Sequence, residues 1–240
     1  MNKKTKPNSG DNIKKDRGGW DFDIGVAKTF DNHVKKSVPL YDEGHQIIVD
    51  SSDYFIKKNS NVYDIGCSTG KLIERLSYFH KHKENINFFG IDSSKEMITS
   101  AKKNNIENSR FTKGDITKVK LKQNSMTVLY YTLQFIDTAY RQEVVNKIYN
   151  SLEWGGALFL FEKVRAADAR FQDITTTTYE EFKVRNNFTN DEIMSKKRSL
   201  VGILEPFSTQ GNLDMLKRAG FVDINSIFKY ICFEGFLAIK

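Results

Sequence analysis

Residues 64–70 read D-I-G-C-S-T-G and hold the clearest chemical potential of the chain. Gly66 and Gly70 permit a tight turn that brings bare backbone close to a ligand. A short apolar strand precedes this turn at residues 61–65, and an amphipathic helix follows it at residues 71–79. Strand, turn and helix N-terminus together favour a site for a polar cofactor at the edge of a parallel sheet.

The glycine spacing separates the cofactor classes that use such a loop. A dinucleotide site needs G-x-G-x-x-G, but no third glycine follows Gly66 in register. A phosphate-binding P-loop needs Gly-Lys followed by Ser or Thr, whereas Leu72 follows Gly70-Lys71. The pattern D-x-G-x-x-x-G resembles motif I of class I S-adenosylmethionine (SAM) methyltransferases. The loop alone is also compatible with a turn that binds nothing.

Acidic residues at the ends of two further predicted strands favour a nucleoside-binding site over a turn that binds nothing. Residues 87–91 form an apolar strand that ends at Asp92, whose carboxylate can accept hydrogen bonds from ribose hydroxyls. Residues 110–114 form another, followed by Asp115, which can accept from an adenine amino group. Cys67 is expected to be a small residue against the ligand, because no histidine lies nearby to activate it. The candidate cofactor-binding residues here are Gly66, Cys67, Ser68, Asp92, Ser93, Asp115 and Ile116.

The predicted elements describe an α/β fold with a doubly wound sheet. Further strands are expected at residues 126–135 and 155–162, with helical patterns between most strands, so the sheet should be largely parallel. Residues 164–208 interrupt the alternation and predict a helical insert of two or three helices. A short helix at residues 215–219 and an antiparallel strand pair end the chain. The insert should cover the sheet edge where a substrate would lie.

Several longer motifs carry a closer resemblance. The chain resembles the carboxy-S-adenosylmethionine synthase family, a branch of the class I SAM-dependent fold, over roughly residues 20–240. The motifs that match are W-x-F-D at residues 20–23, S-V-P-x-Y at 37–41, V-Y-D-x-G-C-S at 62–68, G-D-I at 114–116, T-L-Q-F at 132–135, G-G-A-L at 155–158 and A-G-F at 219–221. Generic methyltransferases do not share S-V-P-x-Y or T-L-Q-F.

The resemblance implies a specific reaction. A carbanion equivalent of SAM captures carbon dioxide released from prephenate and gives carboxy-SAM, which a second enzyme uses to carboxymethylate wobble uridine in tRNA. It also places Tyr41 over the cofactor, and Tyr130 beside it where the family has Asn. A homodimer is implied by the family only. Two alternatives stay open: a small-molecule SAM methyltransferase without a carboxylate pocket, and a non-catalytic SAM-binding partner subunit.

The family holds the carboxylate of carboxy-SAM with an Arg of a K-R-S stretch in the insert. An ungapped match from Phe182 places Lys197 at that position, whereas a one-residue insertion places Arg198 there. We expect Arg198, because Lys lacks the flat bidentate fork of Arg. Val184 stands where the family has Arg, and Asn187 where it has Gly.

Composition bounds the remaining possibilities. The 240 residues have a net charge of +7, and 39% of them are hydrophobic and 28% charged, which is typical of a globular protein. The two cysteines do not indicate a disulfide framework. No apolar run is long enough to span a membrane, and no signal peptide is evident, so a cytoplasmic protein is expected. Residues 1–19 carry six basic and two acidic residues and predict a dispensable disordered tail before the domain at residues 20–240.

The remaining expectations concern partners and chemistry. No histidine, serine or cysteine constellation for catalysis and no metal site is evident. This suits SAM chemistry, because the sulfonium is already activated and the protein mainly binds and orients it. A small, prephenate-like anion is the expected substrate, and no direct contact with nucleic acid is expected.

Overall fold

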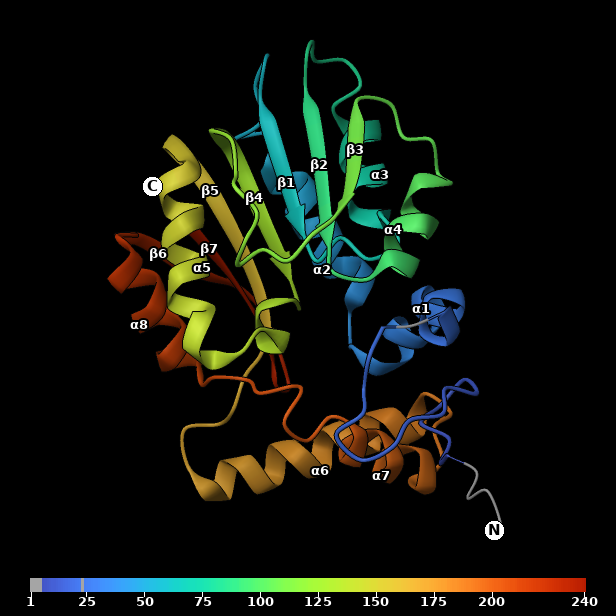
Figure 1. Cartoon of the computed structure of the whole chain (residues 1–240). Coiled ribbons are helices and arrows are strands. Elements are labelled where there is room, and N and C mark those ends of the chain that lie inside the picture. Colours follow the sequence, from blue (N-terminus) through green and yellow to red (C-terminus); the bar gives the residue numbers. More distant parts are fainter. Residues whose placement is uncertain (1–5, 23) are drawn as a thin grey trace.

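A seven-stranded sheet forms the centre of the molecule (Figure 1). The computed structural model describes residues 6–22 and 24–240. The strand order is β3-β2-β1-β4-β5-β7-β6. Pairings among β1 to β5 are parallel, and β7 runs antiparallel to both its neighbours. The strands are β1 (Asn61–Ile65), β2 (Asn87–Asp92), β3 (Ser109–Lys113), β4 (Asn124–Tyr130), β5 (Leu152–Lys163), β6 (Asp223–Tyr230) and β7 (Phe233–Ile239).

Helices cover both faces of this sheet. Helices α2, α3 and α4 pack with one apolar cluster, and α5 and α8 pack with the cluster on the opposite face. The arrangement confirms the predicted doubly wound fold. The helices are α1 (Ile24–Ser37), α2 (Tyr41–Ser52), α3 (Lys71–Phe79), α4 (Lys95–Lys102), the 3-10 turn η1 (Leu133–Phe135), α5 (Thr138–Ser151), α6 (Ala169–Arg185), α7 (Asn190–Ser199) and α8 (Thr209–Ala219).

Strand β5 shows why the sheet is buried on both sides. Successive side chains of a strand point to opposite faces. Phe159 and Phe161 therefore join the cluster of α2 and α3, while Leu158 and Leu160 join the cluster of α5 and α8. All four side chains are fully buried, so β5 reads as a continuous apolar run, as a strand covered on both faces must.

The predicted insert is present between β5 and α8. Helices α6 and α7 lie beyond the carboxyl ends of the parallel strands, with α1 between them and the sheet (Figure 1). Thr189 caps α7 through a capping box with Glu192. Asn187 has a φ of 67°, so the turn between the two helices forms on a residue type that tolerates the left-handed region.

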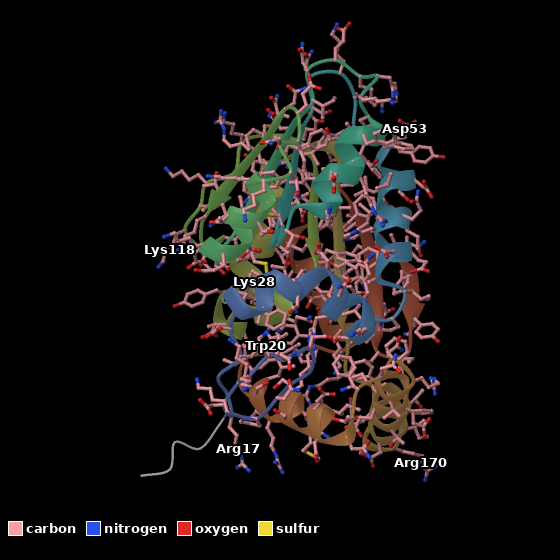
Figure 2. All side chains as sticks on the ribbon, turned by 90° about the vertical axis from the view of Figure 1, so that its right-hand side faces the viewer. Arg17, Trp20, Lys28, Asp53, Lys118 and Arg170 are labelled. Carbon is pink, nitrogen blue, oxygen red and sulfur yellow. The ribbon has the colours of Figure 1, made fainter. Side chains whose placement is uncertain are left out.

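The N-terminal segment differs from the expectation of a disordered tail. Residues 1–5 lie outside the described residues, but residues 6–20 pack against the insert and α1; Figure 2 shows Trp20 between the blue α1 and the orange insert. Ile13 is only 3% exposed, and the Ser9 hydroxyl lies 2.9 Å from that of Ser195 on α7. Ile13 and Trp20, together with several polar contacts, hold the segment. A count of apolar residues does not reveal this packing.

The fourth predicted strand is also shorter than expected. It ends at Tyr130, and η1 replaces its last residues. Tyr131 has a φ of 57°, which breaks the extended conformation. The buried Glu162 carboxylate then accepts a hydrogen bond from the Leu133 backbone N–H at 3.1 Å. Arg141 on α5 donates to the backbone carbonyls of residues 134 and 136, so this turn is held from two sides.

Candidate functional site

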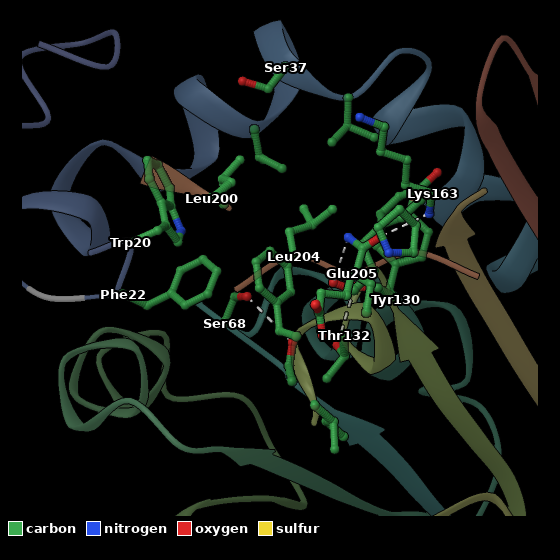
Figure 3. A pocket seen from close by; sticks show the side chains of 18 of the residues that line it. Trp20, Phe22, Ser37, Ser68, Tyr130, Thr132, Lys163, Leu200, Leu204 and Glu205 are labelled. Carbon is green, nitrogen blue, oxygen red and sulfur yellow. Dashed lines mark hydrogen bonds between the residues drawn. The ribbon is translucent and has the colours of Figure 1, made fainter. Parts of the chain in front are cut away.

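A cavity of about 1140 Å³ lies between the carboxyl edge of the sheet and the insert. The loops after β1, β2, β3 and β4 line one half, and α1, α6, α7 and the N-terminal segment line the other. Figure 3 shows Trp20 and Phe22 on one side of this space and Tyr130 and Lys163 on the other. A site of this size, at this edge of an open α/β sheet, suits a nucleoside cofactor together with a second small molecule.

The glycine loop is shaped for close approach. Gly66 has a φ of 78°, and a Cβ atom added there would lie 2.1 Å from Thr132 Oγ1. Gly70, with a φ of 80°, precedes the first turn of α3. No other residue type fits at Gly66 without displacing the T-L-Q-F turn, because both the space and the backbone conformation exclude a side chain.

Asp92 at the end of β2 is held by two backbone groups. Its carboxylate accepts hydrogen bonds from the N–H of Ser68 at 2.9 Å and of Ser94 at 2.8 Å. A carboxylate has about four acceptor positions, so acceptor capacity remains for ribose hydroxyls. Burial raises the pKa of Asp92, and the two backbone hydrogen bonds counter this effect. The carboxylate is therefore fixed in place at the cavity wall before a ligand binds.

The loop after β3 carries Asp115 and Ile116, which are predicted to bind the adenine ring. Asp115 is exposed, and its carboxylate accepts from the backbone N–H and hydroxyl of Thr117, which hold its pKa below the usual range. Ile116 is buried, and its carbonyl accepts from the Lys147 ammonium at 2.9 Å. Asp115 and Ile116 both line the cavity, so this loop is ordered where an adenine ring is expected.

The structure brings most predicted site residues together and leaves two outside. The cavity is lined by Tyr41, Gly66, Ser68, Asp92, Ser93, Asp115, Ile116, Tyr130 and Lys197. Cys67 lies behind the loop, where burial raises its thiol pKa, and lines a separate small cavity instead. Arg198 is exposed and lines neither cavity, although we expected it to face the ligand.

The helical phase of α7 explains the position of Arg198. Lys196, Lys197 and Leu200 line the cavity, and a residue turns by about 100° relative to its neighbour in an α-helix. Arg198 consequently leaves the cavity-facing arc, and its carbonyl accepts from the Gly18 N–H at 3.0 Å. Lys197 is at the rim and pairs with Glu180 on α6 at 3.2 Å. The guanidinium group of Arg198 is suited to bind a carboxylate, but the helix points it away from the cavity.

Three lysines in the cavity wall were not predicted as site residues; Lys183 is buried, and Lys163 and Lys196 are partly buried. Lys163 and Lys183 place their ammonium groups 4.5 and 4.4 Å from the centroid of the Tyr179 ring, and Lys196 lies between α7 and α1. Burial lowers the pKa of all three, to about 8 for Lys183 and about 7 for Lys196. Within the part of the chain that the structure describes, none of the three forms an ion pair with a carboxylate.

Comparisons with known proteins agree with this geometry. A family model described as a methyltransferase domain matches residues 56–219. A carboxy-S-adenosyl-L-methionine synthase from Staphylococcus epidermidis is 37% identical over 216 residues, covering 90% of this chain and 94% of that protein. Its counterpart from Trichodesmium erythraeum is 35% identical over 234 residues, covering 94% and 92%.

The chain belongs to the carboxy-S-adenosyl-L-methionine synthase family. This membership confirms the predicted resemblance and the class of SAM-dependent transferase. It also confirms SAM as the cofactor.

Solved structures show the same fold at low identity. The plantazolicin methyltransferase is 16% identical with a TM-score of 0.64, covering 89% of this chain and 90% of that one. A putative O-methyltransferase from Nostoc punctiforme is 18% identical with a TM-score of 0.63, covering 90% of this chain and 59% of that one. These likenesses confirm the class I architecture.

Three positions where this synthase-family chain departs from the expected pattern have distinct structural outcomes. Tyr130 donates its hydroxyl to the Tyr41 carbonyl at 2.6 Å and closes over Gly44, where an added Cβ would lie 2.2 Å from that hydroxyl. Val184 is half exposed and does not line the cavity. Asn187 keeps its turn. Of the three, Tyr130 alone changes the cavity wall.

No helix in the described residues is long and apolar enough to cross a lipid bilayer.

Proposed function

We propose that this protein makes carboxy-SAM, taking its carboxyl group from a prephenate-like anion, and that the product is used to carboxymethylate wobble uridine in tRNA. The observation that carries the proposal is one continuous cavity with the expected nucleoside-binding loops at one end and, at the other, three ammonium groups that form no ion pair with a carboxylate of the described residues. SAM supplies an activated methyl group when it is bound. The residues of the chain bind it, orient the anion and exclude water.

Electrostatics supports an anionic second ligand. A sulfonium and several partly buried ammonium groups in one cavity repel each other, because Coulomb energies grow as the effective dielectric constant falls. Lys163 and Lys183 are both set on Tyr179, whose ring face partly offsets their charge. A carboxylate between these cations and the sulfonium would relieve the repulsion. A neutral methyl acceptor would leave it in place.

The aromatic side chains beside the glycine loop suit the sulfonium itself. Tyr41, Tyr130 and Tyr131 all line the cavity, and the ring centroids of Tyr41 and Tyr130 are 5.0 Å apart. Burial raises the pKa of each of these phenols, so all three rings stay neutral. Neutral aromatic faces attract a cation, and they do so more strongly where water is excluded.

Tyr130 also supports the second candidate, a small-molecule SAM methyltransferase. Its bulky ring replaces the amide expected from the family, which can both donate and accept hydrogen bonds. If the loss of that amide removed the carboxylated ligand, the cavity would still bind SAM through Asp92 and the glycine loop.

Mass spectrometry of the reaction products tests the proposal. The purified protein is incubated with SAM and prephenate, and the nucleosides are compared with a sample without prephenate. We expect a species heavier than SAM by one carbon dioxide only when prephenate is present. Release of S-adenosylhomocysteine with a methylated acceptor would establish the methyltransferase instead, and binding of SAM without any turnover would establish a non-catalytic subunit.

The predicted homodimer stays a proposal for solution measurement. Phe171 and Ile174 on α6 are 58% and 56% exposed, and they form an apolar stretch on the insert. Light scattering of the purified chain distinguishes a mass near 28 kDa from twice that value.

A further inference from the structure

A chain of hydrogen bonds links the N-terminal segment to the cavity. His33 Nδ1 lies 2.8 Å from Asp11 Oδ2, and His33 Nε2 lies 2.5 Å from Lys196 Nζ. The same ammonium group donates to Ser37 Oγ at 2.8 Å. His33, Ser37 and Lys196 line the cavity, whereas Asp11 lies on the segment that was expected to be disordered. Four residues from three parts of the sequence thus form one hydrogen-bond network, in which His33 and Ser37 contact the Lys196 ammonium directly and Asp11 contacts His33.

The direction of each hydrogen bond follows from chemistry. An ionised carboxylate only accepts, so His33 must donate through Nδ1–H to Asp11. The neutral imidazole then presents Nε2 as an acceptor to Lys196. Burial, followed by the charge of Lys196, lowers the pKa of His33 to about 4, which keeps the ring neutral near pH 7. Asp11 therefore fixes the tautomer that lets His33 hold the lysine.

The surroundings of Lys196 leave one donor for a ligand. Two of its three N–H groups point to His33 and Ser37, and no acceptor within the described residues takes the third. The rings of Trp20 and Phe188 lie 5.2 and 5.8 Å from the nitrogen.

The charged groups that act on Lys196 do not neutralise it. Lys183 and Lys163 add repulsion, and Asp11 behind the imidazole is the carboxylate that opposes them. Lys36 on α1 forms an ion pair with Asp11 at 2.7 Å, so the charge of Asp11 is largely balanced by Lys36.

We propose that Lys196 binds a carboxylate of the anionic substrate, and that His33 and Asp11 position it, so that the N-terminal segment completes the substrate site. The identity of the anion rests on the proposed function. Lys196 is the residue in contact with the ligand. His33 and Asp11 act through Lys196 and are positioning residues.

The protonation of Lys196 gives this proposal a measurable signature. Burial, followed by the charge of Lys183, lowers the pKa of Lys196 to about 7. An adjacent carboxylate favours the charged form and raises this pKa. Slightly above pH 7, the free protein therefore holds a partly neutral amine, and the complex holds an ammonium ion. Binding of the anion must then be accompanied by uptake of a proton from the buffer.

Calorimetry in buffers of different ionisation enthalpy measures that proton. The full-length protein is saturated with S-adenosylhomocysteine and titrated with prephenate at pH 7.5. We expect the wild type to take up a large fraction of one proton, and Lys196→Met to lose most of this uptake and to raise the KM for prephenate by at least tenfold. The affinity for SAM should stay within twofold. Lys58→Met, an exposed lysine paired with Glu84, is the matched control.

The positioning residues have their own readout. His33→Met removes the acceptor for Lys196, whereas His33→Gln retains an oxygen near the position of Nε2. We expect His33→Met and Asp11→Ala to raise the KM for prephenate three- to tenfold with little change in kcat, and His33→Gln to recover part of the loss. Circular dichroism melting shows that each variant is folded. Equal KM values for His33→Met and His33→Gln, both unchanged from the wild type, would overturn the positioning role.

The outcomes separate this inference from the proposed function. Carboxy-SAM formation by the wild type, with the same KM and proton uptake in Lys196→Met, would overturn the inference and leave the function intact. If prephenate gives no carboxy-SAM, malonate serves as a plain carboxylate probe in ¹⁵N-lysine-labelled protein. A malonate-dependent rise in the pKa of a resonance that Lys196→Met abolishes would support the anion site, and its absence would overturn it.

Discussion

The Ser68 backbone N–H donates to the Asp92 carboxylate at 2.9 Å and joins the glycine loop to the end of β2. The same carboxylate binds the N-cap residue of α4 through the Ser94 N–H. Two elements that we expect to bind the nucleoside are thus joined by one side chain. The wall of the cofactor half is formed in the protein itself, and binding does not have to order it.

Removal of this side chain should weaken the cofactor specifically. Asp92→Ala deletes the predicted acceptor for the ribose and leaves the Ser68 N–H without its partner. We expect a loss of about 1–3 kcal/mol in the free energy of SAM binding, measured by calorimetry. Asp50→Ala, an exposed carboxylate on α2, serves as the control and should bind SAM normally. Unchanged affinity in Asp92→Ala would refute the ribose assignment.

Lys197 and Arg198 form a natural pair for testing the carboxylate-binding position. The cavity includes Lys197 and excludes Arg198, so Lys197→Met should lower carboxy-SAM formation at least tenfold, and Arg198→Met should leave it within twofold. Single-turnover assays with SAM and prephenate measure both. The reverse result would mean that α7 turns on ligand binding and that the one-residue insertion in the motif gives the correct match.

The N-terminal segment should contribute to stability. Ile13 is buried, and full burial of such a side chain is worth about 1.5–3 kcal/mol. Deletion of residues 1–19 is therefore expected to lower Tm by about 3–10 °C, measured by scanning calorimetry. Ile13→Ala should reproduce part of this loss, whereas Lys14→Ala at the exposed neighbouring position should not. An unchanged Tm for the deletion would restore the expectation of a dispensable tail.

Glu162 should make stability depend on pH. Burial raises its pKa in the folded protein to about 8, above the 4.5 of the unfolded chain. The folded state therefore holds the proton between these values, and the free energy of unfolding falls as pH rises from about 4.5 to 8. Glu162→Gln keeps an oxygen for the Leu133 N–H and removes the titration. The difference in stability between pH 5 and pH 8.5 should shrink by roughly 2–4 kcal/mol.

Urea denaturation of the variant at both pH values measures this difference. Asp64, whose pKa burial raises to about 7, retains part of the pH dependence. Glu153→Gln on the exposed part of the same strand should behave as the wild type. A variant of Glu162 with an unaltered pH dependence would show that this carboxyl is ionised in the folded protein.

Local patterns in the sequence were sufficient for the cofactor half of the site. Gly66, Asp92 and Asp115 lie at or just after the ends of three strands, and parallel strands end at the same edge of a sheet, so their convergence follows from their positions in the chain. The helix after Gly70 was predictable for the same reason. Each is decided by residues within one turn of the chain.

The substrate half depends on contacts between distant segments. Lys163, Lys183 and Lys196 lie on β5, α6 and α7, and no spacing rule predicts that their ammonium groups share one cavity. Their neighbours in the sequence, such as Phe182, matched family motifs and were the available signal. No local pattern marks His33, because its partners Asp11 and Lys196 are 22 and 163 residues away. Helical phase likewise decided between Lys197 and Arg198.

The division of the cavity wall between β-strand loops and the insert bears on how such proteins diverge. Residues 65–143 line the side of the cavity where we expect the nucleoside, and residues 20–41, 163–206 and 232–233 line the opposite wall. Substitutions in the second set can replace the acceptor without altering the first. Selection for a new reaction can therefore act on one module while the other remains under constraint, and descendants of one ancestral cofactor platform can acquire unrelated chemistries.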